Sequence, residues 1–247
     1  MNQSPMAIEA MDLRKSYGAL AVTRNVSFAL PAGMALGIIG PNGAGKTTLF
    51  NLLTGTVRPD AGSIRFFGAD ISKTDARARC LMGVTRSFQV PQPFVGLTLF
   101  ENALVAATFG QSLSEAAARP MAEDALRRTG LWPKAGKRAG ELGLLDRKRL
   151  ELARSIATAP KLMLLDEIAG GLTDAECAEL IDLILSIKAA GVTIIWIEHV
   201  LHALLRVVDR VMVLDFGQKI AEGEPSKIMQ SPEVAAIYLG LDEPAHG

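Results

Sequence analysis

The chain has 247 residues, of which 49% are apolar and 21% are charged, so it holds enough apolar material for a full core, and global disorder is excluded. Lysine and arginine together number 26, as do aspartate and glutamate, so the formal net charge is zero. This balance disfavours a nucleic-acid binder that relies on a large positive excess, and no nucleic-acid partner is expected. The length fits one large domain, two small domains, or an α/β unit with an inserted subdomain.

The two cysteines, Cys80 and Cys177, are too few for a disulfide framework, which favours a reduced, cytoplasmic compartment. Residues 1–5 do not begin the pattern of a signal peptide, in which a basic segment precedes an apolar one. The longest apolar runs, such as residues 192–197, are far shorter than the roughly 18 residues that span a bilayer. We therefore expect the chain to work at a membrane only through a membrane-embedded partner.

The order of predicted elements indicates an α/β fold. Residues 7–30 are predicted to form short strands with a turn at Gly18, and residues 34–39 form a strand buried on both faces. A helix follows from residue 46 to residue 53. Later buried strands alternate with helical patterns such as residues 175–190, which is typical of a largely parallel sheet. These later strands cover residues 161–165, 192–197 and 210–214.

The middle of the chain, from about residue 94 to residue 159, has no clear strand. It is predicted to be helical over residues 101–109, 113–129 and 147–158. Five prolines lie within, between or on either side of these predicted helices. They are Pro91, Pro93, Pro120, Pro133 and Pro160. A helical block inserted between strands suggests a subdomain that can move separately.

The strongest motif runs from Gly40 to Thr47 and reads Gly-Pro-Asn-Gly-Ala-Gly-Lys-Thr, which matches the phosphate-binding P-loop pattern between a buried strand and a helix. Glycines let the backbone wrap an anion so that successive N–H groups point inward, and the following helix adds the positive end of its dipole. Lys46 is expected to reach the β- and γ-phosphates of a nucleotide, and the Thr47 hydroxyl is expected to bind Mg²⁺.

A second motif supplies the carboxylates that a P-loop enzyme needs. The buried run at residues 162–165 ends in Asp166 and Glu167. Asp166 is expected to hold the Mg²⁺ shell beside the P-loop. Glu167 is expected to act as the general base that polarises the attacking water.

These motifs and the helical block between them resemble the ATP-binding-cassette (ABC) ATPase family. Ser87-Phe88-Gln89 is similar to its Q-loop, and Ile197-Glu198-His199 is similar to its switch-histidine segment. Residues 142–157 align with its signature region, where Arg149 to Arg154 look like the helix that follows the signature. Tyr17 occupies the place of an aromatic residue that stacks on adenine. The resemblance covers nearly the whole chain in the family's motif order.

The resemblance implies one ABC ATPase domain over residues 1–247, with a P-loop core of mostly parallel sheet, an N-terminal antiparallel β subdomain and an inserted helical subdomain. Residues 1–90 hold the β subdomain and part of the P-loop core, residues 91–160 the helical subdomain, and residues 161–247 the rest of the core. Cofactors are expected to be ATP and Mg²⁺. The expected nucleotide contacts are Tyr17, Gly40, Asn42, Gly43, Ala44, Gly45, Lys46, Thr47 and Thr48, and the expected metal contacts are Thr47, Gln89 and Asp166.

The family's mechanism implies that two cassettes close face to face over two ATP molecules, with the P-loop of one and the signature of the other on the same γ-phosphate. Gln89 would sense the phosphate and Mg²⁺, and His199 would contact the γ-phosphate and orient Glu167. Lys46 completes the expected catalytic set. Taken singly, His199 also fits a core histidine, Tyr17 a strand aromatic and Gln89 a loop amide. A groove near the Q-loop would receive a short helix of a membrane permease.

Within the family, the chain is most similar to ATPase subunits of branched-chain amino acid importers. Residues 85–89 (Thr-Arg-Ser-Phe-Gln) resemble their Q-loop context, and residues 234–240 resemble their tail. This implies import of a small solute, a substrate-binding protein as partner, and a peripheral location on the inner face of the cell membrane. The alternatives are an export or lipid-moving ABC ATPase and a non-transport ABC protein that acts on nucleic acid or the ribosome.

The signature departs from the family's Leu-Ser-Gly-Gly-Gln. Residues 142–146 read Leu-Gly-Leu-Leu-Asp, so Gly143 lacks the serine hydroxyl, Leu145 replaces a glycine, and Asp146 adds negative charge near the partner's ATP. We therefore expect a heterodimer rather than a homodimer, because a second cassette could supply an intact signature. The basic run at residues 146–149 is expected to be a solvated helix start.

Two smaller departures flank the next motif. Ile168 replaces the usual proline after Glu167, and Thr173 replaces the usual Asp or Asn of the D-loop at residues 169–173.

Overall fold

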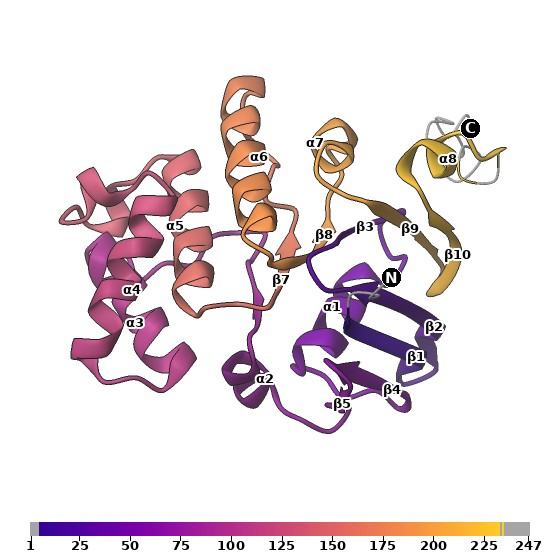
Figure 1. Cartoon of the computed structure of the whole chain (residues 1–247). Coiled ribbons are helices and arrows are strands. Elements are labelled where there is room, and N and C mark those ends of the chain that lie inside the picture. Colours follow the sequence, from indigo (N-terminus) through magenta and orange to yellow (C-terminus); the bar gives the residue numbers. More distant parts are fainter. Residues whose placement is uncertain (1–4, 233, 235–247) are drawn as a thin grey trace.

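The computed structural model describes residues 5–232 and 234, so the predicted importer-like tail at residues 234–240 lies outside the described part except for its first residue. Two sheets and a separate block of helices make up the chain (Figure 1). The strands are β1 (Met6–Tyr17), β2 (Leu20–Pro31), β3 (Ala35–Ile39), β4 (Ala61–Phe66), β5 (Ala69–Asp70), β6 (Val84–Arg86), β7 (Leu162–Asp166), β8 (Thr193–Ile197), β9 (Arg210–Asp215) and β10 (Gln218–Gly223). The helices are α1 (Lys46–Thr54), α2 (Ala76–Met82), α3 (Leu99–Gln111), α4 (Glu115–Arg128), α5 (Leu144–Ala157), α6 (Asp174–Ala189), α7 (Leu201–Leu205) and α8 (Pro225–Met229).

The N-terminal sheet is antiparallel, with the strand order β2-β1-β4-β5. The predicted turn at Gly18 joins β1 to β2, and Gly18 adopts a φ of +60°, which a glycine reaches without a steric penalty. Several register shifts along the β1–β2 pair bend these strands. The antiparallel β subdomain expected from the family resemblance is confirmed.

The core sheet has the order β10-β9-β3-β8-β7-β6, and every pair in it is parallel except the edge pair of β10 and β9. The predicted mostly parallel sheet is therefore confirmed. Because parallel strands run in one direction, the carboxyl ends of β3, β6, β7 and β8 all lie along one edge of this sheet. That edge carries the motifs described below.

Alternating residues of each core strand face two different apolar clusters. Leu162 and Leu164 of β7 pack with α1 and the N-terminal sheet. Met163 and Leu165 face the opposite side, where they pack with α6 and the helical block. This period of two explains why the strand reads as one continuous apolar run in the sequence.

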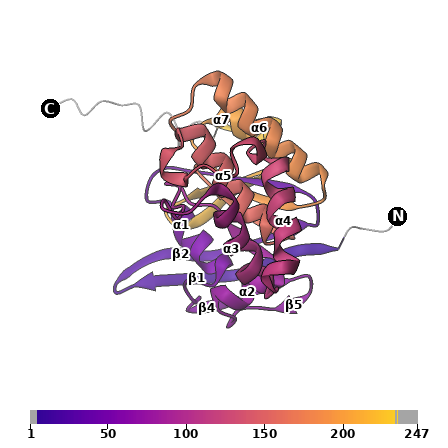
Figure 2. The same ribbon diagram turned by 90° about the vertical axis from the view of Figure 1, so that its left-hand side faces the viewer.

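Helices α3, α4 and α5 form a block at one side of the molecule, which Figure 2 places in front of the core. The block agrees with the predicted helical insertion. Pro120 lies inside α4, as the predicted helix over residues 113–129 requires. The helix continues through the proline with the loss of a single backbone hydrogen bond. Within residues 5–232 and 234, every helix is too short or too polar to cross a bilayer.

The buried Arg79 of α2 holds the far end of α1, the helix that follows the P-loop. Its guanidinium donates to the carbonyl oxygens of Leu52 and Leu53 at 2.6 and 2.8 Å, to Ile71 at 2.6 Å and to Thr74 at 3.0 Å. Burial lowers the pKa of Arg79 to about 10, so it stays cationic at neutral pH. It therefore caps α1 at the carboxyl end of the helix dipole.

Replacing Arg79 by methionine is expected to lower the free energy of unfolding by about 3 kcal/mol, because buried carbonyl oxygens lose a charged donor. Equilibrium unfolding in urea measures the change. The matched control is Arg77→Met on the exposed face of the same helix, which is expected to stay within about 0.5 kcal/mol of the wild type. Equal losses from the two variants would contradict the capping role of Arg79.

Candidate nucleotide site

Four loops meet at the carboxyl edge of the core sheet. Residues 40–45 follow β3, residues 87–98 follow β6, residues 167–173 follow β7, and residues 198–200 follow β8. Each loop carries one of the motifs recognised in the sequence. The parallel sheet thus brings together segments that are far apart along the chain.

The P-loop has the backbone conformation that its glycines permit. Gly40, Gly43 and Gly45 have φ values of +149°, +83° and +96°. A Cβ atom on Gly40 would lie 2.0 Å from the carbonyl oxygen of Leu214, and one on Gly45 would lie 2.6 Å from that of Val22. These two positions therefore require glycine for close backbone packing as well as for φ.

The loop encloses a pocket of about 190 Å³. Its lining residues are Val22, Asn42, Gly43, Ala44, Gly45, Lys46, Thr47, Thr48 and Glu167. The predicted P-loop contacts from Asn42 to Thr48 thus share one pocket with the predicted base Glu167. Gly40 is not among the lining residues.

Lys46 lies over the P-loop with only 7% of its surface exposed. Its Nζ atom donates to the carbonyl oxygens of Gly40 at 2.6 Å and Pro41 at 2.9 Å. An ammonium group has three N–H donors, so one remains for an anion in the pocket. Burial lowers the pKa of Lys46, and the nearby carboxylates of Glu167 and Asp166 oppose this effect.

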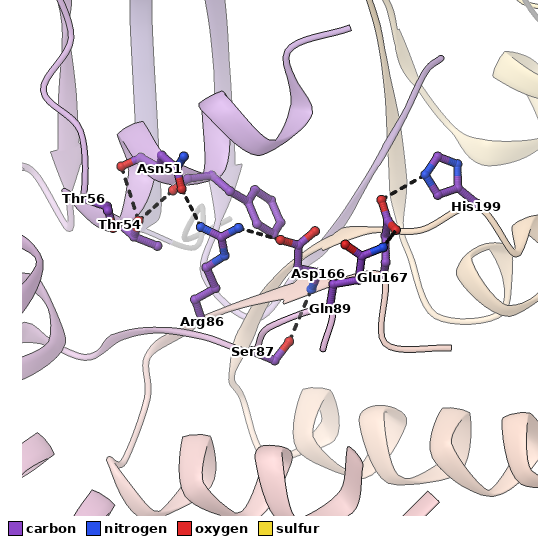
Figure 3. A network of polar contacts seen from close by, with 10 residues as sticks. Asn51, Thr54, Thr56, Arg86, Ser87, Gln89, Asp166, Glu167 and His199 are labelled. Carbon is purple, nitrogen blue, oxygen red and sulfur yellow. Dashed lines mark hydrogen bonds and ion pairs between the residues drawn. The ribbon is translucent and has the colours of Figure 1, made fainter. Parts of the chain in front are cut away.

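Glu167 lies between Gln89 and His199, as Figure 3 shows. Its Oε1 atom is 2.9 Å from Nε2 of His199, and its Oε2 atom accepts from Nε2 of Gln89 at 2.5 Å. The backbone of Glu167 has a φ of +46°, which is a strained conformation for a residue with a side chain. The structure thus brings together three of the four residues predicted to be catalytic. The sharp turn after β7 places Glu167 at the lining of the P-loop pocket.

Two charged residues that support this site were missed by the sequence analysis. Arg86 at the end of β6 forms an ion pair with Asp166 at 2.5 Å. Glu198 is 2% exposed and accepts hydrogen bonds from the backbone N–H groups of Ala169 at 2.9 Å and His199 at 3.0 Å. In the sequence, the only indication of a role for Arg86 or Glu198 is that each charged residue lies directly beside a recognised motif.

Thr47 lines the P-loop pocket, whereas Asp166 and Gln89 are not among its lining residues. Asp166 is close enough to raise the pKa of Lys46, and Gln89 is bonded to Glu167, so the three side chains together fit a magnesium ion that arrives with a triphosphate. Thr47, Asp166 and Gln89 offer oxygen atoms, which are the ligands that Mg²⁺ prefers. Within the described ranges, no three His, Cys, Asp or Glu residues cluster closely enough to hold a metal by themselves. A Mg²⁺ site of the usual kind has one or two protein ligands that act together with substrate phosphates.

Comparison with known proteins identifies the family. The family model "ABC transporter" matches residues 23–170. The ATP-binding protein LivG of high-affinity branched-chain amino acid transport in Salmonella typhimurium is 35% identical, over 97% of this chain and 99% of LivG. This chain belongs to the ABC transporter family.

The relatives include proteins named for export as well. The lipopolysaccharide export ATP-binding protein LptB of Acidithiobacillus ferridurans is 32% identical, over 94% of this chain and 96% of LptB. The solved ADP conformation of an ATP-binding cassette of an ABC transporter has a TM-score of 0.85 and 29% identity, and the match covers 95% of this chain and 99% of that one. The chain is thus an ATP-hydrolysing ABC transporter subunit with the fold of the family.

The expected adenine-stacking residue of this ABC ATPase, Tyr17, ends β1 and is 49% exposed. The Nζ atom of Lys15 lies 5.6 Å from the centre of its ring. Tyr17 is not among the residues that line the P-loop pocket, although Val22 of the same hairpin is. Stacking of Tyr17 on adenine stays a prediction.

The altered signature of this ABC ATPase forms the start of α5. Gly143 is the N-cap residue and makes no side-chain capping bond, in line with its missing hydroxyl. Leu144 is 43% exposed, and a Cβ atom on Gly171 would lie 3.3 Å from Leu144 Cδ2. An apolar leucine therefore lies beside the D-loop at the position of the first signature glycine, and Leu145 replaces the second.

Two expectations about residues 146–149 change with the structure. Asp146 pairs with Lys134, and its Oδ1 atom lies 3.9 Å from Arg149, so cations of the same subdomain offset its charge. The predicted solvated helix start was wrong for Lys148, which is 4% exposed and donates from Nζ to the carbonyl oxygen of Ile168 at 2.6 Å. Lys148 thus ties the signature helix to the segment that follows Glu167.

Replacing Glu167 by glutamine is expected to slow ATP hydrolysis by about 10²- to 10⁴-fold, because an amide cannot take a proton from water. ATP binding is expected to persist. Steady-state phosphate release and calorimetry measure the two effects separately. Lys46→Ala gives the contrast, because it removes a phosphate contact and is expected to weaken binding itself. Unchanged turnover in Glu167→Gln would show that Glu167 is not the base.

Proposed function

We propose that this ABC ATPase powers the import of a small solute, branched-chain or related amino acids, through a membrane permease. The observation that supports the proposal is the 35% identity to LivG over almost the whole length of both chains. The P-loop pocket and the group of Glu167, Gln89 and His199 supply the parts that hydrolysis needs. A substrate-binding protein would deliver the solute, and the ATPase would lie peripherally on the cytoplasmic face of the membrane.

We expect the following roles for the site residues. Lys46 and the P-loop amides would hold the β- and γ-phosphates, and Thr47, Asp166 and Gln89 would hold Mg²⁺, which neutralises charge on those phosphates. His199 would fix the carboxylate of Glu167 while it accepts a proton from water. Positioning and charge stabilisation together would account for most of the catalysis.

A groove of about 720 Å³ offers a place for the permease. It lies between α2, α3, the end of α5 and the segment after Gln89, and its walls include Phe94, Val105, Phe109 and Arg154. Phe109 is 75% exposed, and Phe94 is 49% exposed. A short amphipathic helix of a permease would cover this apolar surface, and its position next to the Q-loop would couple transport to hydrolysis.

The export alternative is supported by the 32% identity to LptB. The ATPase alone does not select between the two directions, because the cargo binds to other subunits. The subunit composition of the intact transporter does distinguish them.

Isolation of the intact complex from membranes, with the chain tagged at its own locus, is expected to yield permease subunits, a second ATPase and a solute-binding protein. Uptake of labelled leucine should fall to background in a Glu167→Gln strain that makes the same amount of protein. A complex that holds permease but no solute-binding protein would favour export. A complex without permease would contradict the transport proposal.

The altered signature supports a heterodimer, in which each site is built from two different chains. Hydrolysis by the isolated chain is expected to be slow, because each site of a homodimer would meet a signature without the serine hydroxyl and without either glycine. The triple variant Gly143→Ser/Leu144→Gly/Leu145→Gly should accelerate hydrolysis by the isolated chain about 10²-fold, the order of one transition-state donor. Full activity of the unmodified chain alone would contradict the heterodimer.

A further inference from the structure

Arg86 lies where three segments of the nucleotide site meet (Figure 3). Its Nη2 atom donates to Oδ2 of Asp166 at 2.5 Å, and its Nη1 atom donates to Oδ1 of Asn51 at 2.6 Å. The side chains of Arg86 and Asp166 are only 13% and 9% exposed. The guanidinium therefore joins the end of β7 to helix α1 in a place largely shielded from water.

The partner on α1 connects Arg86 to the P-loop. Asn51 follows Thr47 by four residues, so the two side chains share one face of the helix. Thr47 and Asp166 are two of the three groups proposed to hold Mg²⁺. Arg86 thus links the face of α1 that carries Thr47 to the end of β7, which carries Asp166.

Two aromatic rings also hold the guanidinium. Its Cζ atom lies 5.5 Å from the ring centre of Phe50 and 5.6 Å from that of Phe88. Phe88 directly precedes Gln89, so the same arginine contacts the Q-loop. With two charge-assisted hydrogen bonds and two cation–π contacts, Arg86 has little freedom to move.

The ion pair occupies only one side of the Asp166 carboxylate. Oδ2 accepts from Arg86, whereas no group in the described part of the chain donates to Oδ1. A buried ion pair contributes little net stability compared with apolar residues of the same volume. The ion pair is better explained by its effect on the orientation of Asp166, because the carboxylate keeps Oδ1 available for a cation.

We propose that Arg86 is a positioning residue that orients Asp166 to receive the magnesium ion of ATP. The inference rests on the proposed role of Asp166 and Thr47 as Mg²⁺ ligands and adds a residue to that role. Arg86 acts through Asp166 and Asn51 and does not touch the nucleotide. Partners that orient a metal ligand typically change metal affinity by about 10- to 100-fold when they are removed.

The test compares ATP affinity with Mg²⁺ and with EDTA, measured by calorimetry in a Glu167→Gln background so that ATP is not consumed. The magnesium gain is the dissociation constant in EDTA divided by the dissociation constant with Mg²⁺. Arg86→Met is expected to lower this gain about tenfold, while the affinity in EDTA changes less than about twofold. A general structural defect would weaken both affinities together, so the ratio separates positioning from folding.

Three further variants sharpen the comparison. Arg210→Met is the matched control, because it removes a 2.9 Å ion pair with Glu222 from the start of β9 in the same sheet, and its magnesium gain should be unchanged. Asn51→Ala keeps the ion pair with Asp166 and should cause a smaller loss than Arg86→Met. In the Asp166→Asn background, Arg86→Met should cause no further loss, because the two residues act as one unit.

A magnesium gain that is unchanged in Arg86→Met would overturn the proposal. A larger gain would also overturn it, because Arg86 would then compete with the metal for Asp166. If Arg86→Met does not fold, Arg86→Lys and Asn51→Ala decide the question, and two unchanged ratios would refute it. Absence of ATP binding by the parent protein would instead refute the ATPase function, and ATP binding without a magnesium gain would refute only the role of Arg86.

Discussion

The nucleotide site depends on the burial of α1 between two sheets. Leu49, Phe50, Leu52 and Leu53 are fully buried in the cluster that joins the N-terminal sheet to the core sheet. The helix cannot shift without losing apolar contacts on both sides, each buried side chain being worth about 1.5 to 3 kcal/mol. Its first turn is therefore a fixed platform for Lys46 and Thr47.

The hydrolysis loops are held by a different kind of contact. Glu167, Gln89 and His199 come from three separate loops, and their only mutual contacts are two hydrogen bonds. The side chains of Glu167 and His199 are 22% and 46% exposed. Polar contacts of this kind exchange easily with water or phosphate oxygens, whereas a packed apolar helix does not. ATP binding thus relies on the rigid helix α1, and hydrolysis relies on the less rigid loops that carry Glu167, Gln89 and His199. Hydrolysis can therefore be lost while ATP binding persists.

The α5 helix connects two of the hydrolysis loops to the proposed permease groove. Lys148 binds the carbonyl oxygen of Ile168, just after the proposed base. Two turns later, Arg154 binds the carbonyl oxygen of Gln92 at 2.9 Å and lines the groove proposed for the permease. Between them, Glu151 pairs with Arg154 at 2.9 Å, and burial raises its pKa. A displacement of the helical block would therefore move the Q-loop and the segment that follows Glu167 at the same time.

The sequence was sufficient for those features that a short, contiguous pattern determines. The P-loop, Asp166 and the buried strands could be predicted because each is one apolar run ending in a few constrained residues. Arg86 could not, because it ends a strand of three residues and its two partners lie 35 and 80 residues away. Lys148 was misjudged for the same reason, since only tertiary contacts show that a lysine in a basic run is buried.

The contrast between the intact P-loop site and the altered signature follows from where each part is used. In an ABC dimer of the expected kind, the core of one chain and the signature helix of the other would enclose one ATP. Changes at Gly143 and Leu145 would therefore weaken the partner's site and leave the chain's own P-loop contacts unaffected. Lys134 and Arg149 offset the charge of Asp146, so this charge is not the main departure from the family's signature. The main departure is steric, because leucine side chains occupy space where a phosphate must approach the backbone closely. Such a chain can keep one fully active site provided that a second, different cassette supplies the missing half.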